Sequence, residues 1–301
     1  MNINRRDFLS TSALASGSLL ARSRKRPFQM PADFTITILA TNWGFQGSTN
    51  AFCAKAKESG YDGIEVWYPM EEKVRTELMA ALEKYDLKYG FLVGGRSDDF
   101  ETNFEEFKQQ TDAAAAARPL FLNCHSGKDY FSFEQNSQFI DYTLEVEQKT
   151  GIPIYHETHR GKILFNAPLT SRFLQDYPEL RLTLDISHWC VVHTSLLHNQ
   201  KEAVTLALSR TEHIHSRVGH SQSPQVSDPR APEWSKAVDT HFAWWDQVIE
   251  NKIKRGDKSL TMTTEFGPPH YMPALPYTGQ AVANLWAVNT HMKDLWRERY
   301  A

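Results

Sequence analysis

Four apolar runs in the second half of the sequence each carry an acidic or histidine residue near their end. These residues lie in the segments Tyr155–Glu157, Leu184–Asp185, His213–Arg217 and Thr264–Glu265. Three carboxylates and an imidazole brought together would repel one another and shift their pKa values unless a cation joined them. An oxygen-rich set with one nitrogen suits Mn²⁺ first, with Mg²⁺, Co²⁺ or Zn²⁺ as alternatives. A single member would be an ordinary buried polar group, but four in succession predict a divalent metal site.

The elements that must position these residues alternate regularly along the chain. Short β-branched or aromatic runs occur at 34–41, 63–67, 87–93, 120–125, 153–157, 180–186, 213–218 and 260–266. Helical patterns lie between them, such as 71–85, 103–117, 134–150 and 201–210. Ser48 is placed to begin the first helix and Gly60 to follow its end, and Gly151 is placed to follow the fourth helix.

Eight strand–helix units predict a single (β/α)₈ TIM barrel over residues 31–301. An open doubly wound sheet is the alternative, and it would need a Gly-rich phosphate-binding turn after its first strand. The turn here, Asn42–Gly47, has no such fingerprint.

In a barrel of this kind the active site lies at the carboxyl ends of the strands. His213 and His215 share one face of their strand because side chains alternate. We therefore expect the metal ligands to be Glu157, Asp185, Glu265 and one of these histidines. His215 is favoured over His213 because it lies nearer the end of the strand.

These strand ends resemble the xylose isomerase-like sugar phosphate isomerase/epimerase superfamily. The resemblance covers about residues 34–296 and rests on the segments 156–161, 184–189, 213–219 and 264–267, with Asp62–Glu65 earlier in the chain. It implies the metal set Glu157, Asp185, His215 and Glu265, and substrate-binding roles for His188 and Arg217. His159 stands close to where the epimerases of this superfamily carry a second Glu.

The chemistry implied by this resemblance is proton transfer on a carbohydrate through an enediolate. The metal would make a proton next to a carbonyl more acidic, and carboxylates would remove and return it. Glu157 and Glu265 are the expected catalytic residues. The sequence leaves open isomerisation, epimerisation, or β-elimination from oxidised (3-keto) glycosides.

Other residues are expected to line a sugar pocket. They are Glu65 on the second strand, Asn123 and His125 on the fourth, His159, and the tryptophans Trp43 and Trp189, whose rings could stack on a sugar. The loop 219–234 and the turn 267–271 are further candidates, with His270 expected to reach the site.

The first residues predict an export signal. Residues 1–26 hold six basic residues and one acidic residue, a net charge of +5, so the −3 of the whole chain leaves −8 for the rest. Arg5 and Arg6, followed by Phe8-Leu9 and a mild apolar stretch, resemble a twin-arginine signal. We expect residues 1–30 to be a leader and the protein to be periplasmic, with its three cysteines unpaired.

The composition excludes several classes of protein. The sequence has no apolar run of 18 residues, which argues against a membrane span, and the acidic remainder argues against nucleic acid as a partner. The expected partner is a small carbohydrate, and the oligomeric state stays open, a homodimer included. A carbohydrate-binding barrel without catalysis is the alternative from another class.

Overall fold

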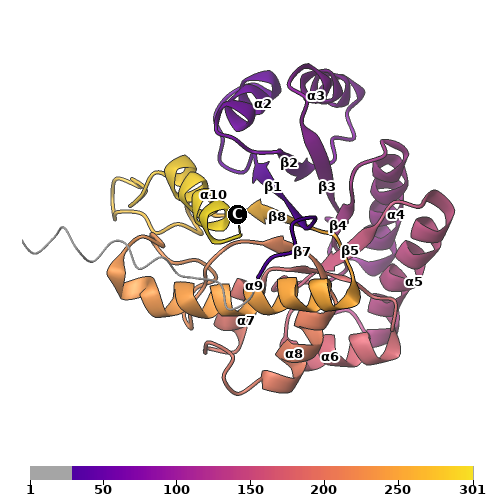
Figure 1. Cartoon of the computed structure of the whole chain (residues 1–301). Coiled ribbons are helices and arrows are strands. Elements are labelled where there is room, and N and C mark those ends of the chain that lie inside the picture. The colour runs from indigo at the N-terminus through magenta and orange to yellow at the C-terminus, as the bar shows by residue number, and fades with distance from the viewer. Residues whose placement is uncertain (1–28, 301) are drawn as a thin grey trace, which may run out of the picture.

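Eight parallel strands close into one barrel in the computed structural model, which describes residues 29–300 (Figure 1). The strands are β1 (Thr35–Thr41), β2 (Gly63–Trp67), β3 (Lys88–Gly94), β4 (Leu122–His125), β5 (Ile154–Glu157), β6 (Leu182–Leu184), β7 (Thr211–His215) and β8 (Ser259–Thr264). Each strand pairs with the next in the sequence, and β8 closes the barrel by pairing with β1. The predicted (β/α)₈ fold is thereby confirmed.

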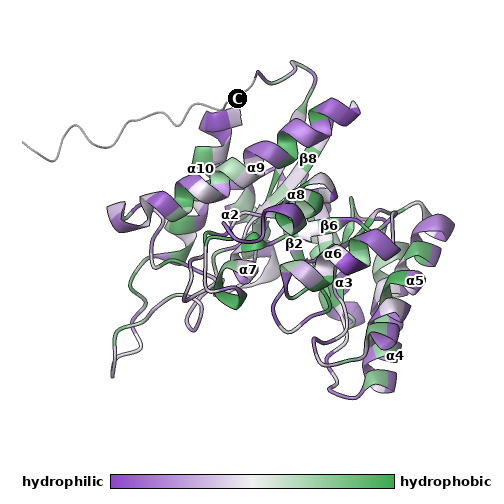
Figure 2. Ribbon diagram, turned by 90° about the horizontal axis from the view of Figure 1, so that it is seen from below, coloured by the Kyte–Doolittle hydropathy of each residue, from purple (hydrophilic) through white to green (hydrophobic). Residues whose placement is uncertain are grey.

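Helices surround the strands on the outside. They are α2 (Thr49–Glu58), α3 (Glu72–Lys84), α4 (Phe100–Ala116), α5 (Phe133–Thr150), α6 (Ala167–Asp176), α7 (Ile186–Val192), α8 (Lys201–Ser209), α9 (Ser235–Arg255) and α10 (Leu285–Tyr300), with a short 3₁₀ turn at Pro232–Trp234. Figure 2 shows hydrophobic and hydrophilic residues alternating along them. Their apolar faces bury large rings: Phe107 of α4 packs edge-on against Phe139 of α5, with ring centroids 5.0 Å apart.

Helix boundaries follow the expected capping chemistry. The Ser48 side chain accepts a hydrogen bond from the Ala51 N–H at the start of α2. Gly151 ends α5 in the left-handed conformation, at φ 71°, which glycine adopts without steric cost. Ser132 and Gln135 form a reciprocal capping box at the start of α5.

Three predicted strand ends, those of β6, β7 and β8, were wrong. Ile186 belongs to α7 rather than to β6, because the Asp185 side chain accepts from the Ser187 N–H (3.1 Å) and begins a helix there. Strands β7 and β8 end at His215 and Thr264, earlier than predicted. Arg217 and Glu265 therefore lie just beyond their strands rather than within them.

The predicted leader falls outside the described residues, apart from its last two positions. Within residues 29–300, no helix combines the length and apolar character needed to cross a membrane. Cys53, Cys124 and Cys190 are buried and free, as expected.

A buried histidine in α9 makes stability depend on pH. The Nε2 atom of His241 accepts from the Gly219 N–H (3.1 Å), and Nδ1 donates to the Ala237 carbonyl (2.8 Å). Burial lowers the pKa of His241 to about 4. The folded state therefore favours the neutral ring. The stabilisation that results is fully present above the unfolded pKa of about 6.5.

We expect the His241 contribution to fall by about 3 kcal/mol as the pH drops from about 6.5 to about 4. The measurement is urea unfolding of the wild type and His241→Gln at several pH values. The gap in unfolding free energy between them should narrow in acid. A gap that stays constant with pH would contradict the buried neutral ring.

Candidate metal centre

Four polar side chains converge at the carboxyl ends of four successive strands. Glu157 is the last residue of β5 and His215 the last of β7, while Asp185 and Glu265 directly follow β6 and β8. Each offers one ligand atom, and these atoms all lie within 4.8 Å of one another. The structure thus brings together the four residues that the sequence predicted as metal ligands.

The four residues differ in how far they face the mouth of the barrel. Glu157, Asp185 and His215 are at most 2% exposed, whereas Glu265 is 9% exposed. Glu265 is therefore the member of the cluster most open to a small molecule entering from solvent.

Several polar atoms of this cluster lack a hydrogen-bond partner among the described residues. They are Glu157 Oε1, Glu265 Oε2 and His215 Nδ1. His215 Nδ1 lies 3.0 Å from Glu265 Oε2 and 3.6 Å from Glu157 Oε2. Buried polar atoms without partners are rare and costly in folded proteins. Two unpartnered carboxylate oxygens and one imidazole nitrogen, with the carboxylate of Asp185 beside them, fit a divalent cation.

Arg217 is the principal cation beside these carboxylates. Its guanidinium pairs with Asp185 Oδ2 and donates to the Glu265 carbonyl (3.3 Å) and the Ser187 hydroxyl (3.2 Å). It also lies 2.7 Å from His188 Nε2. Arg217 is only 1% exposed, so its first role in this structure is to balance buried negative charge.

Burial and neighbouring charges move the pKa values of the cluster in opposite directions. Burial raises the pKa of Asp185 to about 7 despite the charge of Arg217. Burial also acts on Glu157, but the imidazoles of His125 and His215 outweigh it and hold its pKa well below the ordinary value. For His215, burial is outweighed by Glu265, Glu65 and Glu157, which raise its pKa well above the usual range. A bound cation would displace a proton from His215.

A row of rings borders the carboxylates. His125 Nε2 lies 2.7 Å from Glu157 Oε2, and its ring centroid is 4.8 Å from that of His159. His159 packs against His188 at 3.9 Å. Burial, aided by neighbouring positive groups, holds the pKa values of His159 and His188 well below their usual range. Both rings are therefore neutral at pH 7 and able to accept or donate hydrogen bonds.

Tyr271 is a site residue that the sequence reasoning missed. Its hydroxyl lies 3.4 Å from His159 Nε2, and Arg217 lies over its ring at 4.7 Å from the centroid. The turn 267–271 was expected to reach the site, but through His270, which is exposed. The contact between Tyr271 and Arg217 joins residues far apart in the sequence, so no local pattern identified this ring.

The second strand supplies a buried carboxylate that lies beneath the cluster. Glu65 is 0% exposed and contacts His213, His215, Asn123 and Thr263. The expected contact of Glu65 with a sugar finds no support, because both of its oxygens are already bonded within the barrel. His213 also contacts Glu65 and lies outside the four-residue cluster. Thr263 and Thr261 lie two and four residues before Glu265, respectively, and share the inward face of β8. The alternation of side chains along a strand could have identified them.

The two candidate tryptophans lie in different surroundings. Trp43 is half-buried and meets Tyr271 edge-on, with ring centroids 4.8 Å apart. Trp189 is 0% exposed and its indole N–H donates to the Leu164 carbonyl (3.0 Å). The expected stacking of Trp189 on a sugar is corrected to core packing, because the ring is fully buried and its N–H is already bonded.

The long loop after β7 is hydrogen-bonded to the segment that follows Glu265. Gln225 donates to the Gly267 carbonyl (3.0 Å) and accepts from the Gly267 N–H (2.7 Å). Gly267 has no room for a side chain, since a Cβ there would lie 2.4 Å from the Trp43 ring. The loop, the segment after Glu265 and Trp43 therefore form one connected rim.

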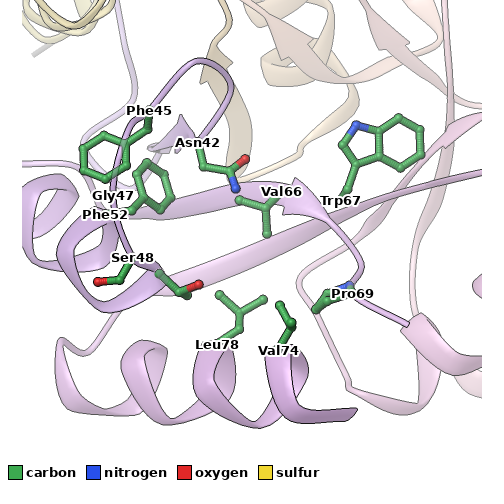
Figure 3. Close-up of a pocket in the computed structure, with 11 residues that line it drawn as sticks. Asn42, Phe45, Gly47, Ser48, Phe52, Val66, Trp67, Pro69, Val74 and Leu78 are labelled. Carbon is green, nitrogen blue, oxygen red and sulfur yellow. The ribbon is translucent and has the colours of Figure 1, made fainter. Parts of the chain in front are cut away.

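A cavity of about 110 Å³ lies outside the cluster, beside the ends of β1 and β2 (Figure 3). Asn42 and Val66 line it at the ends of β1 and β2, and Val74 and Leu78 line it from α3. Trp67 also borders it, and the Trp67 ring meets His125 edge-on at 5.0 Å. None of its lining residues belongs to the four-residue cluster.

Comparison with known proteins places the barrel in a family. Residues 53–230 match the family described as xylose isomerase-like TIM barrel. Similar solved structures include a 3-keto-D-glucoside 4-epimerase from E. coli in apo form, with 15% identity over 87% of this chain and 99% of that one and a TM-score of 0.54. They also include a probable 3-DHS dehydratase from Bacillus anthracis (16% identity, 87% and 99% covered, TM-score 0.54). A third is a family 2 AP endonuclease from Brucella melitensis (14% identity, 77% and 93% covered, TM-score 0.51). No curated protein matches the chain.

Removing the buried arginine should destabilise the protein, because the carboxylates of the cluster would then repel one another without it. We expect Arg217→Met to lower the unfolding free energy by about 3–5 kcal/mol in chelator, because Asp185 would lose its buried cation. Urea unfolding with and without a divalent cation measures the effect, and the cation should recover more stability in the variant than in the wild type. The control is Lys254→Met, which removes an exposed ion pair with Glu250. It should lower the unfolding free energy by less than about 1 kcal/mol. Equal stability of Arg217→Met and the wild type would contradict this role.

Proposed function

The chain belongs to the xylose isomerase-like TIM barrel family, and we propose that it is a metal-dependent enzyme that moves a proton next to a carbonyl group of a carbohydrate. The observation that carries the proposal is the buried cluster of Glu157, Asp185, His215 and Glu265. Its unpartnered inward-facing atoms make a ligand set rather than a self-satisfied network. Isomerisation or epimerisation is the reaction class we propose first.

The four residues of the cluster would hold the cation, with His215 binding through Nδ1. A bound divalent cation would polarise the substrate carbonyl and make the adjacent C–H more acidic. The predominance of carboxylate oxygen favours Mn²⁺ in our proposal, with Mg²⁺, Co²⁺ or Zn²⁺ as alternatives.

Glu157 and Glu265 are suited to proton transfer for different reasons. Glu157 is held ionised by its imidazole neighbours, as a general base must be. His125, whose side chain is 13% exposed, contacts Glu157 directly and gives it a route for exchanging protons. Glu265 faces the mouth more openly and would return a proton from its own side of the substrate.

The rim would position the substrate. His188 and Arg217 would donate to substrate hydroxyls or to the oxygen that gains charge during the reaction. His159, Tyr271 and Trp43 would border the bound sugar, with Trp43 offering a ring face to it.

A β-eliminating lyase on 3-keto glycosides is the second candidate. It uses the same deprotonation but loses a substituent from the neighbouring carbon. The named activities of two structural neighbours, an epimerase on a 3-keto glucoside and a probable dehydratase, support testing both outcomes on one panel of substrates.

The test is incubation of the Mn²⁺-loaded protein in D₂O with ketoses and 3-keto-glucosides. We expect deuterium at the carbon next to the carbonyl, read by mass spectrometry, and product identity separates epimerase from lyase. Glu265→Gln should reduce incorporation at least 100-fold, because general acid–base catalysis contributes about 10²–10⁴ in rate. Chelator should abolish incorporation and added Mn²⁺ restore it.

Glu179→Gln is the matched control, since Glu179 is exposed and precedes β6 at the opposite end of the barrel. It should leave incorporation unchanged. Full incorporation by Glu265→Gln would refute the assignment. A wild type with no bound metal and no incorporation would favour a binding barrel instead.

We further propose that residues 1–30 direct export to the periplasm by the twin-arginine route. Replacing Arg5 and Arg6 by Lys retains the charge and removes the arginine pair, so export should fail while folding is unaffected. Fractionation of expressing bacteria measures this. Periplasmic protein in the double-lysine variant at the wild-type level would contradict the proposal.

A further inference from the structure

Glu65 stands apart from the metal cluster because its hydrogen-bonding capacity is fully used. Its Oε2 atom lies 3.1 Å from His213 Nε2 and 3.0 Å from His215 Nε2, and it accepts from the Thr263 hydroxyl. Its Oε1 atom accepts from Asn123 Nδ2 at 3.0 Å. A carboxylate accepts about four hydrogen bonds, so Glu65 is already satisfied by its neighbours, although Glu65, His213 and His215 also lie close enough together to hold a cation.

The two nitrogens of His215 therefore face different partners. Nδ1 faces Glu265 and Glu157 and lacks a hydrogen-bond partner, whereas Nε2 faces Glu65. Nε2 and Nδ1 each lie 3.0 Å from a carboxylate oxygen, that of Glu65 and that of Glu265 respectively, so each carries a proton when no cation is bound, since two lone pairs would otherwise oppose each other. A cation in the cluster would take the place of the Nδ1 proton, and the neutral ring would then keep its proton on Nε2, toward Glu65.

Asn123 supports the same assignment. Its amide nitrogen lies 3.0 Å from Glu65 Oε1 and 3.1 Å from Glu157 Oε2. These two carboxylates take both amide hydrogens, so His215 Nε2, 3.2 Å away, receives none. The amide also joins Glu65 to a member of the cluster.

We propose that Glu65 is a positioning residue that holds His215 in the tautomer able to bind a metal through Nδ1. The inference rests on the proposed function, because it takes the four-residue cluster as the metal site. It reassigns Glu65 from the sugar pocket to the support of a ligand, and it assigns the ligand role to His215 and a structural role to His213. A carboxylate that orients a ligating histidine raises metal affinity about 10–100-fold.

The test compares metal affinity in the wild type, Glu65→Gln and His213→Gln by chelator competition, without substrate. Glu65→Gln should bind the cation about 10–100-fold more weakly, because a glutamine holds the Nε2 proton less firmly. His213→Gln is the matched control, since it perturbs the same buried network but leaves the Glu65–His215 bond. Its affinity should stay within about threefold of the wild type.

A second measurement detects the hydrogen bond between His215 and Glu65 directly. In Mg²⁺-loaded, ¹⁵N-labelled protein, the His215 Nε2 proton should show the downfield shift of a hydrogen bond to a carboxylate in the wild type and in His213→Gln, and should lose that shift in Glu65→Gln. If Glu65→Gln fails to fold, Glu65→Asp keeps the charge and withdraws the carboxylate, and it should also weaken binding.

The outcomes separate this inference from the proposed function. A wild type that binds no cation refutes the function. Binding that is equal in Glu65→Gln and His213→Gln, with an unchanged His215 signal, overturns the positioning role alone. Two cations per chain, one of them lost in Glu65→Gln, would also overturn it, because Glu65 would then be a ligand.

Discussion

Mutual repulsion among buried carboxylates is the constraint on which the structure at the carboxyl ends of the strands depends. Glu157, Asp185 and Glu265 crowd around one imidazole where little water can reach them. Arg217 offsets part of this charge from the β7 side, and the His125 ring contacts Glu157 from the β4 side. A cation among the ligand atoms would supply the remaining balance, and the unpartnered atoms show where that balance is lacking.

Below this charged group the barrel interior is polar and largely hydrogen-bonded. Glu65, Asn123 and Thr263 bond one another or the histidines of β7, and of these three side chains only Asn123 has an atom, Oδ1, without a partner. A connected network of this kind is rigid, because each member fixes the orientation of the next. The site therefore has two levels, one with unpartnered ligand atoms that can receive a cation and one that supports it through hydrogen bonds.

Much of this arrangement followed from the sequence, and the failures have physical causes. The cluster was predictable because parallel strands end at one edge of the barrel, which brings Glu157, Asp185, His215 and Glu265 together. The role of Trp189 was predicted wrongly because Asp185 begins a helix immediately after β6. Side chains repeat every 3.6 residues along a helix but alternate along a strand. Tyr271 could not be placed, since its position depends on a turn rather than on a periodic element. The role of Glu65 depends on which donors surround it, and those come from three other strands, β4, β7 and β8.

The double hydrogen bond between Gln225 and Gly267 has a consequence for how a substrate is admitted. It joins the loop after β7 to the segment that carries Glu265, and Trp43 closes over Gly267. A rim built in this way is preformed, so selection among sugars would rest on fit to a fixed outline rather than on closure of a flap. Substrates that differ in bulk at this edge would be distinguished at the moment of entry.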